Sequence, residues 1–184
     1  MVLTSLDPFA SVQDATRRHV RDHGCGAYTY SNGSLPGVIV GIAGAHRVVE
    51  VGTALGYTAL WLAHGAPEAH VDTIENDGEH VTLARAAIGE RQMSERITVH
   101  HGEADDILGT LEVAAYDVAF FDGFTPTVRT LTRMRALLRP GGTLVAGNLT
   151  LNPGPDVEAD LDDPTRWLVH SFGETALCVK QGTA

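Results

Sequence analysis

Lysine, cysteine and long apolar runs are all scarce in this sequence, and each scarcity excludes a class of protein. Lys180 is the only lysine among 184 residues, and the formal net charge is −10 at pH 7. Proteins that bind nucleic acid contact phosphates mainly through clustered Lys and Arg, so we expect no nucleic-acid partner. No apolar run approaches the length of a membrane span, and residues 1–23 carry charges throughout. We therefore expect neither a signal peptide nor a membrane.

The two cysteines, Cys25 and Cys178, lie far apart along the chain. This spacing predicts neither a disulfide framework nor a zinc site, and a reducing cytoplasm is the expected location. The length fits one domain, which we place over residues 1–184. The richest basic stretch, Arg17 to Arg21, is interpreted as the solvated face of a helix, with a patch for a phosphorylated substrate as the alternative.

Apolar segments alternate with amphipathic ones through most of the chain, which predicts strands alternating with helices. The expected strands cover residues 47–51, 70–75, 97–101, 117–121 and 143–146, and two more cover 167–172 and 175–180. The expected helices cover residues 7–23, 37–43, 58–64, 77–91 and 106–111, and a further one begins at Thr125-Pro126 and carries Leu138 on its apolar face. Such alternation is typical of a parallel sheet with helices on both faces. The last two strands are separated only by Gly173-Glu174, which predicts an antiparallel hairpin. The fold class is therefore α/β, a Rossmann-like domain with a mostly parallel seven-stranded sheet.

Each of the five parallel strands ends at or near a polar residue. In an open α/β sheet, ligands bind beyond the carboxyl ends of the strands, so these side chains are the first candidates for a site. They are Glu50, Glu75, Glu103, Asp122 and Asn148.

The turn after the first strand carries the most informative pattern. Gly52 and Gly56 allow a sharp bend and a close approach to a ligand. Glu75 ends the next strand, where a carboxylate can accept hydrogen bonds from both hydroxyls of a ribose. The Gly-x-Gly-x-x-Gly fingerprint of a dinucleotide site is absent, and acidic Glu50 suits an ammonium better than a pyrophosphate. The pattern favours a nucleoside ligand, the alternative being turn glycines beside a surface carboxylate.

Several segments together resemble one known family. They are 47–53, 56–58, 73–75, 102–104, 117–122 and 138–142. In this order and spacing they are similar to the class I S-adenosylmethionine-dependent methyltransferases, and to the catechol O-methyltransferase-like and small bacterial, caffeoyl-CoA-type O-methyltransferases in particular. The resemblance runs from about Ser31 to Lys180.

The resemblance implies S-adenosylmethionine as cofactor and assigns residues to it. Those expected around the methionine part and its turn are Glu50, Gly52, Thr53, Gly56, Tyr57, Thr58 and Asp122. Glu75 would hold the ribose with Asn76 beside it, and Glu103 and Ala104 would flank the adenine. Residues 1–36 would form an N-terminal helix and a capping loop in which Tyr28 closes over the cofactor. The family also implies a last strand inserted beside the fifth, and commonly a homodimer.

The catalytic set departs from the family. Asp122 and Asn148 match two of the usual ligands for a divalent metal such as magnesium, but Gly147 stands where a second aspartate is usual, so the metal is doubtful. Thr125 stands where the catalytic lysine is usual, and Lys180 cannot replace it by sequence position. Asp122 and Asn148 remain the catalytic candidates. His23, His100 and His101 are alternative bases, and Phe124 is a candidate wall of the acceptor pocket or an anchor for the next helix. The helix between the fifth and sixth strands is expected to be lost or reduced.

These observations predict an enzyme, most simply an O-methyltransferase acting on a small hydroxylated acceptor, whether aromatic or not. The same scaffold can also serve an N-methyltransferase. A catalytically silent protein that binds S-adenosylmethionine is the alternative from another class, and a nicotinamide-dependent oxidoreductase is disfavoured by the missing fingerprint.

Overall fold

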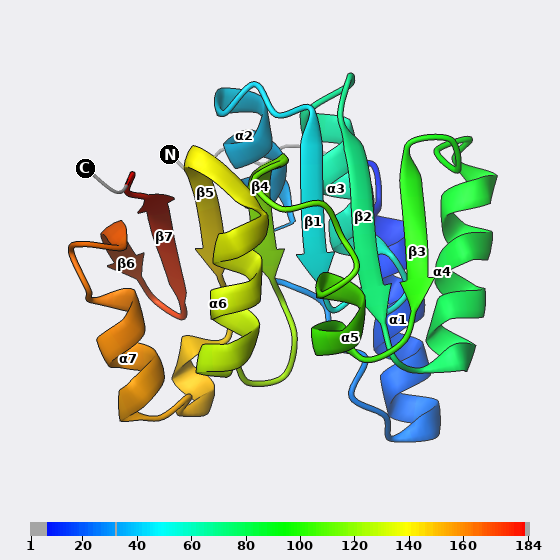
Figure 1. Cartoon of the computed structure of the whole chain (residues 1–184). Helices are drawn as coiled ribbons and strands as arrows, with labels where there is room; N and C mark the ends of the chain where they lie inside the picture. Colours follow the sequence, from blue (N-terminus) through cyan, green and yellow to red (C-terminus); the bar gives the residue numbers. More distant parts are fainter. Residues whose placement is uncertain (1–6, 32, 183–184) are drawn as a thin grey trace, which may run out of the picture.

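A single seven-stranded sheet forms the centre of the molecule (Figure 1). The structure, a computed structural model, describes residues 7–31 and 33–182. The strand order is β3-β2-β1-β4-β5-β7-β6. The strands are β1 Arg47–Val51, β2 His70–Glu75, β3 Ile97–His101, β4 Tyr116–Phe121, β5 Leu138–Ala146, β6 Trp167–Phe172 and β7 Thr175–Lys180. The fold is the predicted Rossmann-like α/β fold with a mostly parallel seven-stranded sheet.

Strand directions place the carboxyl ends of β1 to β5 along one edge. These five strands pair in parallel, and their arrowheads point to the same edge in Figure 1. β7 is antiparallel to both neighbours and lies between β5 and β6. The bounds of β6 and β7 and the insertion of the last strand beside the fifth are confirmed. Glu174, in the turn between them, consequently returns to the edge where the parallel strands end.

Helices cover both faces because consecutive strand residues point in opposite directions. Val48 joins the core beneath the helices of the first half, and Val49 joins the core beneath those of the second half. The first set is α1 Ala10–His23, α2 Ser34–Ile42, α3 Tyr57–Gly65 and α4 Gly78–Glu90. The second set is α5 Ala104–Leu108, α6 Val128–Leu137 and α7 Pro155–Leu161.

Four helix positions differ from the predictions. α1 begins at Ala10, because the Asp7 carboxylate accepts from Phe9 N and from the Tyr57 hydroxyl and so fixes the chain before the helix. α2 begins at Ser34, three residues before the predicted start. α5 overlaps the predicted 106–111, but it begins two residues earlier and ends three residues earlier. α6 is capped by Thr127, which leaves Thr125 outside it.

Leu138 was predicted on the helix but begins β5. It is fully buried and lies beside Tyr116 of β4, so its apolar character belongs to the sheet rather than to the helix face. The helix between the fifth and sixth strands is reduced to α7 rather than lost. Among the described residues, no helix is long and apolar enough to cross a bilayer.

Candidate functional site

Glu50 lies at the centre of the edge where the parallel strands end. Its side chain is completely buried, and one oxygen, Oε2, accepts a 2.6 Å hydrogen bond from Thr73 Oγ1. Because Thr73 uses its proton there, Thr53 is the donor in the 2.6 Å contact between the two threonine hydroxyls. Burial, together with the negative charges of Asp122 and Glu75, raises the pKa of Glu50 well above its usual range.

The other oxygen of this carboxylate, Oε1, has no hydrogen-bond partner among the described residues. A buried acceptor without a partner costs free energy unless a ligand supplies a donor. The cation expected here, the ammonium of a methionine moiety, would supply both a donor and a positive charge. Glu50 therefore fits the role predicted for it.

The turn that follows β1 is held by both neighbouring strands. Gly52 N donates to Ile74 O of β2, and Asp122 N, just after β4, donates to Val51 O. Glu75 Oε2 accepts from Ala54 N at 2.9 Å, and Ala54 has a positive φ of 45°. Glu75, a predicted cofactor residue, is thus bonded to the backbone of the turn that holds Gly52, Thr53 and Gly56, so it shapes this turn as well as facing the edge.

Gly52 is the residue of this turn that tolerates least change. Its φ is +96°, and a Cβ there would lie 2.5 Å from Asp122 O. We expect Gly52→Ala to destabilise the fold by about 2–4 kcal/mol, since conformational strain of about 1–2 kcal/mol adds to a steric clash. Gly173→Ala is the matched control, because Gly173 has a φ of +57° and open space around it, and it should cost only the strain. Urea unfolding of both variants measures the difference, and equal costs would contradict the clash.

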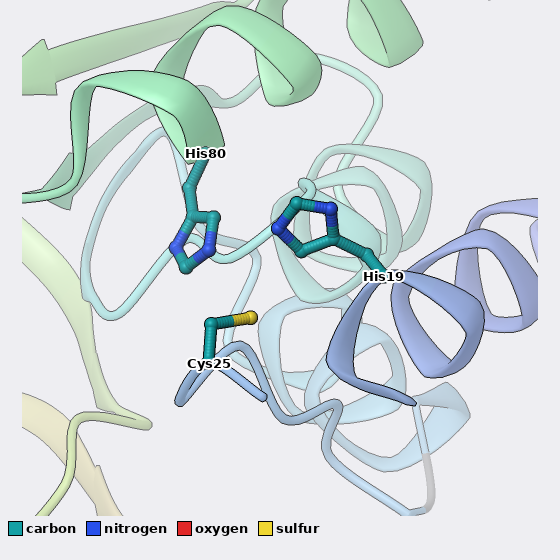
Figure 2. Close-up of side chains that lie close together, drawn as sticks. All are labelled: His19, Cys25 and His80. Carbon is teal, nitrogen blue, oxygen red and sulfur yellow. The ribbon is translucent and has the colours of Figure 1, made fainter. Parts of the chain in front are cut away.

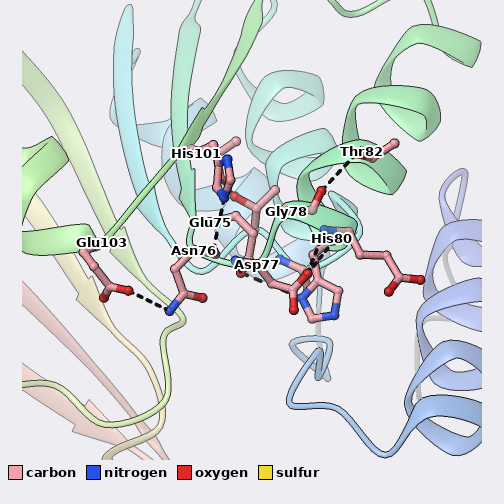
Figure 3. A network of polar contacts seen from close by, with 12 residues as sticks. Glu75, Asn76, Asp77, Gly78, His80, Thr82, His101 and Glu103 are labelled. Atoms are coloured by element: carbon pink, nitrogen blue, oxygen red, sulfur yellow. Dashed lines mark hydrogen bonds and ion pairs between the residues drawn. The ribbon is translucent and has the colours of Figure 1, made fainter.

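Asn76, Glu103 and Ala104 lie together beyond β2 and β3. Asn76 Nδ2 donates to Glu103 Oε1 at 3.3 Å, and His101 Nε2 lies 3.3 Å from Asn76 O. Figure 3 shows this network continuing through Glu75 and Asp77 to the first turn of α4. Asn76 and Glu103 are exposed, as an open adenine subsite would require, and Ala104 begins α5 beside them.

Asp122 directly follows β4 in a setting that disfavours its charge. Burial and the nearby Glu174 raise the pKa of Asp122 to about 8, while hydrogen bonds from Thr58 and Asn148 lower it. The Asn148 contact is long, 3.5 Å from Nδ2 to Oδ1, and the same nitrogen donates to Gly123 O at 2.6 Å. Thr58, Asp122 and Asn148 are thus brought together as predicted, with Glu174 as a neighbour the sequence did not single out.

Tyr30 is a further residue that sequence reasoning missed. It is buried, its ring packs edge to face on Phe120, and its hydroxyl lies 2.6 Å from Thr175 Oγ1. Its pKa is raised, first by burial and also by Asp122 and Glu174. Tyr28, the tyrosine predicted to cap the cofactor, is 68% exposed on the same loop. No sequence pattern singled out Tyr30, because its burial depends on contacts with Phe120 and Thr175, which lie far away along the chain.

Tyr57 is oriented toward the N-terminal segment. Its hydroxyl donates to Asp7 at 2.6 Å, and burial, followed by this hydrogen bond, raises the pKa of Tyr57 to about 12. Its predicted contact with the cofactor stays a prediction. Gly56 caps α3 with a φ of 92°.

The alternative bases have other partners or lie elsewhere. His100 Nε2 lies 2.7 Å from Asp72 Oδ1, and His23 stacks on His19. Lys180 Nζ donates to Arg135 O and Leu138 O at the end of α6, so it is not a substitute for the missing lysine. Phe124 is 73% exposed. A Cβ on Gly26 would lie 3.9 Å from the Phe124 ring, which places this ring beside the capping loop.

The donors at Asp122 and Asn148 fit a divalent metal poorly. Asp122 is a carboxyl group with a raised pKa, and the Asn148 amide nitrogen is directed at Asp122 and Gly123. Gly147 supplies no side chain, and a Cβ on it would lie 2.9 Å from Phe121 O. An aspartate at this position would therefore require the backbone to move, so the departure from the family pattern is built into the strand packing.

Relatives in sequence carry O-methyltransferase names. The O-methyltransferase family model matches residues 12–176. A Mycolicibacterium vanbaalenii protein with a provisional O-methyltransferase name is 35% identical over 140 residues, which cover 74% of this chain and 62% of the relative. Catechol O-methyltransferase of Mycobacterium tuberculosis is 31% identical over 136 residues, which cover 73% of this chain and 62% of the relative. The chain thus spans less than two thirds of the length of these curated relatives.

A solved structure agrees with the fold. The O-methyltransferase TomG of Streptomyces achromogenes, involved in tomaymycin synthesis and solved in complex with S-adenosylmethionine, superposes with a TM-score of 0.83 at 23% identity. The match covers 99% of this chain and 93% of TomG. Because the family model matches most of the sequence, and relatives above 30% identity cover nearly three quarters of it, this chain belongs to the O-methyltransferase family.

Proposed function

We propose that this protein is an S-adenosylmethionine-dependent O-methyltransferase for a small hydroxylated acceptor. The observation that carries the proposal is the buried Glu50 carboxylate, whose Oε1 has no partner among the described residues and which lies beside the Gly52 turn. Family membership supports the reaction class, and the S-adenosylmethionine bound to TomG supports the cofactor.

The chain's residues divide the work of binding along the edge. Glu50 holds the ammonium and Glu75 the ribose, while Asn76 and Glu103 flank the base. Bound S-adenosylmethionine supplies an electrophilic methyl group on its sulfonium. The protein's task is to hold an acceptor oxygen in line with it, and such orientation accounts for roughly 7–11 kcal/mol in well-placed reactants.

Proton removal falls to Asp122 in this proposal. A general base works best with a pKa near the working pH, and that of Asp122 is raised to about 8. Tyr30 and Asn148 position it, Tyr30 by filling the space beside Gly147 and Asn148 by its amide contact. Because the donors fit a divalent cation poorly, we propose that the transfer proceeds without magnesium.

The test is calorimetric titration of S-adenosylhomocysteine into wild-type protein and Glu75→Ala, with magnesium and with EDTA. We expect wild type to bind with micromolar affinity. Glu75→Ala should bind at least about 10-fold more weakly, because the lost carboxylate made charge-assisted hydrogen bonds to the ligand. EDTA should leave the affinity of both proteins unchanged. Glu95→Ala, an exposed glutamate at the amino end of β3, is the control and should bind as wild type does. Glu75 also holds Ala54 N, so circular dichroism must show the variant folded. Failure of folded wild type to bind would overturn the proposal.

A second candidate is a silent binder of S-adenosylmethionine, favoured by Gly147 and Thr125 at the usual aspartate and lysine positions. A panel of phenols and amines separates the possibilities. Transfer to phenols supports the proposal, transfer to amines alone indicates an N-methyltransferase, and binding without transfer indicates the silent protein. A homodimer, a cytoplasmic location and the absence of nucleic-acid partners stay predictions.

A further inference from the structure

Two histidines and a cysteine from three segments converge beside the N-terminal helix (Figure 2). His19 lies on α1, Cys25 on the loop that follows it, and His80 in the first turn of α4. One ligand atom of each lies within 4.8 Å of the others. Figure 2 shows the two rings and the thiol directed at a common point. We propose that these three residues form a binding site for zinc, a function that goes beyond methyl transfer.

The donor chemistry selects the ion. Two imidazoles with one thiolate suit Zn²⁺ and similar borderline transition metals, whereas Mg²⁺ and Ca²⁺ prefer oxygen. Tetrahedral zinc with ligands at about 2.0–2.3 Å requires its donors to stand about 3.3–3.6 Å apart, so the three donors, which lie within 4.8 Å of one another, would move closer together when the ion binds. Three protein ligands leave a fourth position for water.

The surroundings of His80 match those of a metal-bound imidazole. The ring is buried, and Nδ1 lies 3.8 Å from Glu75 Oε1. A carboxylate partner commonly orients a metal-bound histidine and raises the basicity of the ligating nitrogen. Nδ1 faces Glu75 at a distance longer than a hydrogen bond, which leaves Nε2 as the ligand atom in this proposal, and a small rotation of the ring on metal binding would bring Nδ1 within hydrogen-bond reach of Glu75. The ring of His19 meets that of His80 edge to face with centroids 5.2 Å apart.

A second arrangement shares His19. His23 and Glu79 also place donors within 4.8 Å of it and of each other, but both are exposed. We favour the Cys25 arrangement because a thiolate binds zinc more strongly than an exposed carboxylate does, and because His80 is already buried and oriented. The ion would join α1 and the capping loop to α4, the helix that begins three residues after Glu75.

Binding of Co²⁺ in place of zinc can be followed by absorption spectroscopy, because a thiolate ligand gives a characteristic band. We expect Co²⁺ added to chelator-treated protein to produce a thiolate-to-metal charge-transfer band, and Zn²⁺ to displace it. Cys25→Ser should remove the band, although Cys178 remains, because Cys178 is fully buried away from solvent. Zinc affinity of Cys25→Ser and His80→Ala should fall at least about 100-fold, since even outer-shell changes cost 10–100-fold.

His23→Ala is the matched control, because it removes a histidine of the same helix but leaves the proposed ligands. It should keep the band and the affinity. Zinc should also slow tryptic cleavage at the exposed Arg17, Arg18 and Arg21 of α1 in wild type but not in Cys25→Ser. No charge-transfer band in folded wild type, an unchanged zinc affinity in Cys25→Ser, or equal losses in His23→Ala would overturn the proposal. None of these readouts depends on S-adenosylmethionine, so they are independent of the proposed function.

Discussion

Glu50→Gln is expected to make the ligand-free protein more stable while weakening its binding of S-adenosylhomocysteine. In the free protein, burial disfavours the charged carboxylate and raises its pKa well above the usual range. Gln is neutral at every pH and keeps an oxygen that accepts from Thr73. It removes the cost of a buried charge, which we expect to raise Tm by about 2–4 °C per kcal/mol recovered.

The affinity should change in the opposite direction. The ammonium of the ligand loses a charged partner, and hydrogen bonds to charged groups contribute about 1.5–3 kcal/mol. Binding should therefore weaken about 10- to 100-fold. Calorimetry measures this, and scanning calorimetry measures Tm on the same samples. A Gln variant that binds as tightly as wild type would remove Glu50 from the site.

The stability gain should depend on pH, and its sign follows from linkage. A carboxyl whose pKa is higher in the folded state takes up a proton on folding, so its contribution to stability falls as pH rises above its ordinary value. The Tm difference between Glu50→Gln and wild type should thus grow from acidic to neutral pH. Glu112→Gln is the control, because Glu112 is an exposed partner of Arg47 and should show neither effect.

Apolar periodicity explains why the strands were predictable. Residues such as Val48, Val71 and Val118 are fully buried, so the pattern that marks them also fixes their strands. Helix starts were less predictable, because they depend on tertiary contacts. Asp7 shows this, since its carboxylate is engaged by Tyr57, a residue fifty positions away, and α1 starts later than its sequence alone indicates.

The residues of the candidate site also differ in how predictable they were from the sequence. Glu50 and Glu75 lie in the last two residues of β1 and β2 and Asp122 directly follows β4, so strand order alone brings them to one edge. Tyr30 and Glu174 reach that edge from a loop and from the β6–β7 turn, so no spacing rule marked them. Cys25 illustrates the limit most clearly, because the distance between cysteines predicted no zinc site, whereas the fold supplies histidines from two helices.

Asp122→Asn is expected to lower kcat about 10²- to 10⁴-fold, the range for loss of a general base. Binding of S-adenosylhomocysteine should change less than tenfold, because the amide fills the same space and can still accept from Thr58 and Asn148. This contrast separates a catalytic role from a binding role. Equal losses in affinity and in turnover would make Asp122 a cofactor ligand only.

The pH profile tests the same group without changing it. With a pKa raised to about 8, Asp122 is largely protonated in neutral solution and becomes a base as pH rises. In wild type, kcat/KM for S-adenosylmethionine reports groups of the free enzyme and should rise with pH through a midpoint near 8 and level off above it. Asp122→Asn should lack this rise in kcat/KM.

Glu174→Gln provides the decisive comparison, because it leaves the proposed base in place and removes the negative charge that helps to raise its pKa. The midpoint of the profile should move to lower pH, while the plateau rate stays within a few fold of wild type. An unmoved midpoint would mean that another group governs the profile. A downward shift would link the β6–β7 turn electrostatically to proton removal, and would explain how this edge can operate with threonine and glycine where the family usually has lysine and aspartate.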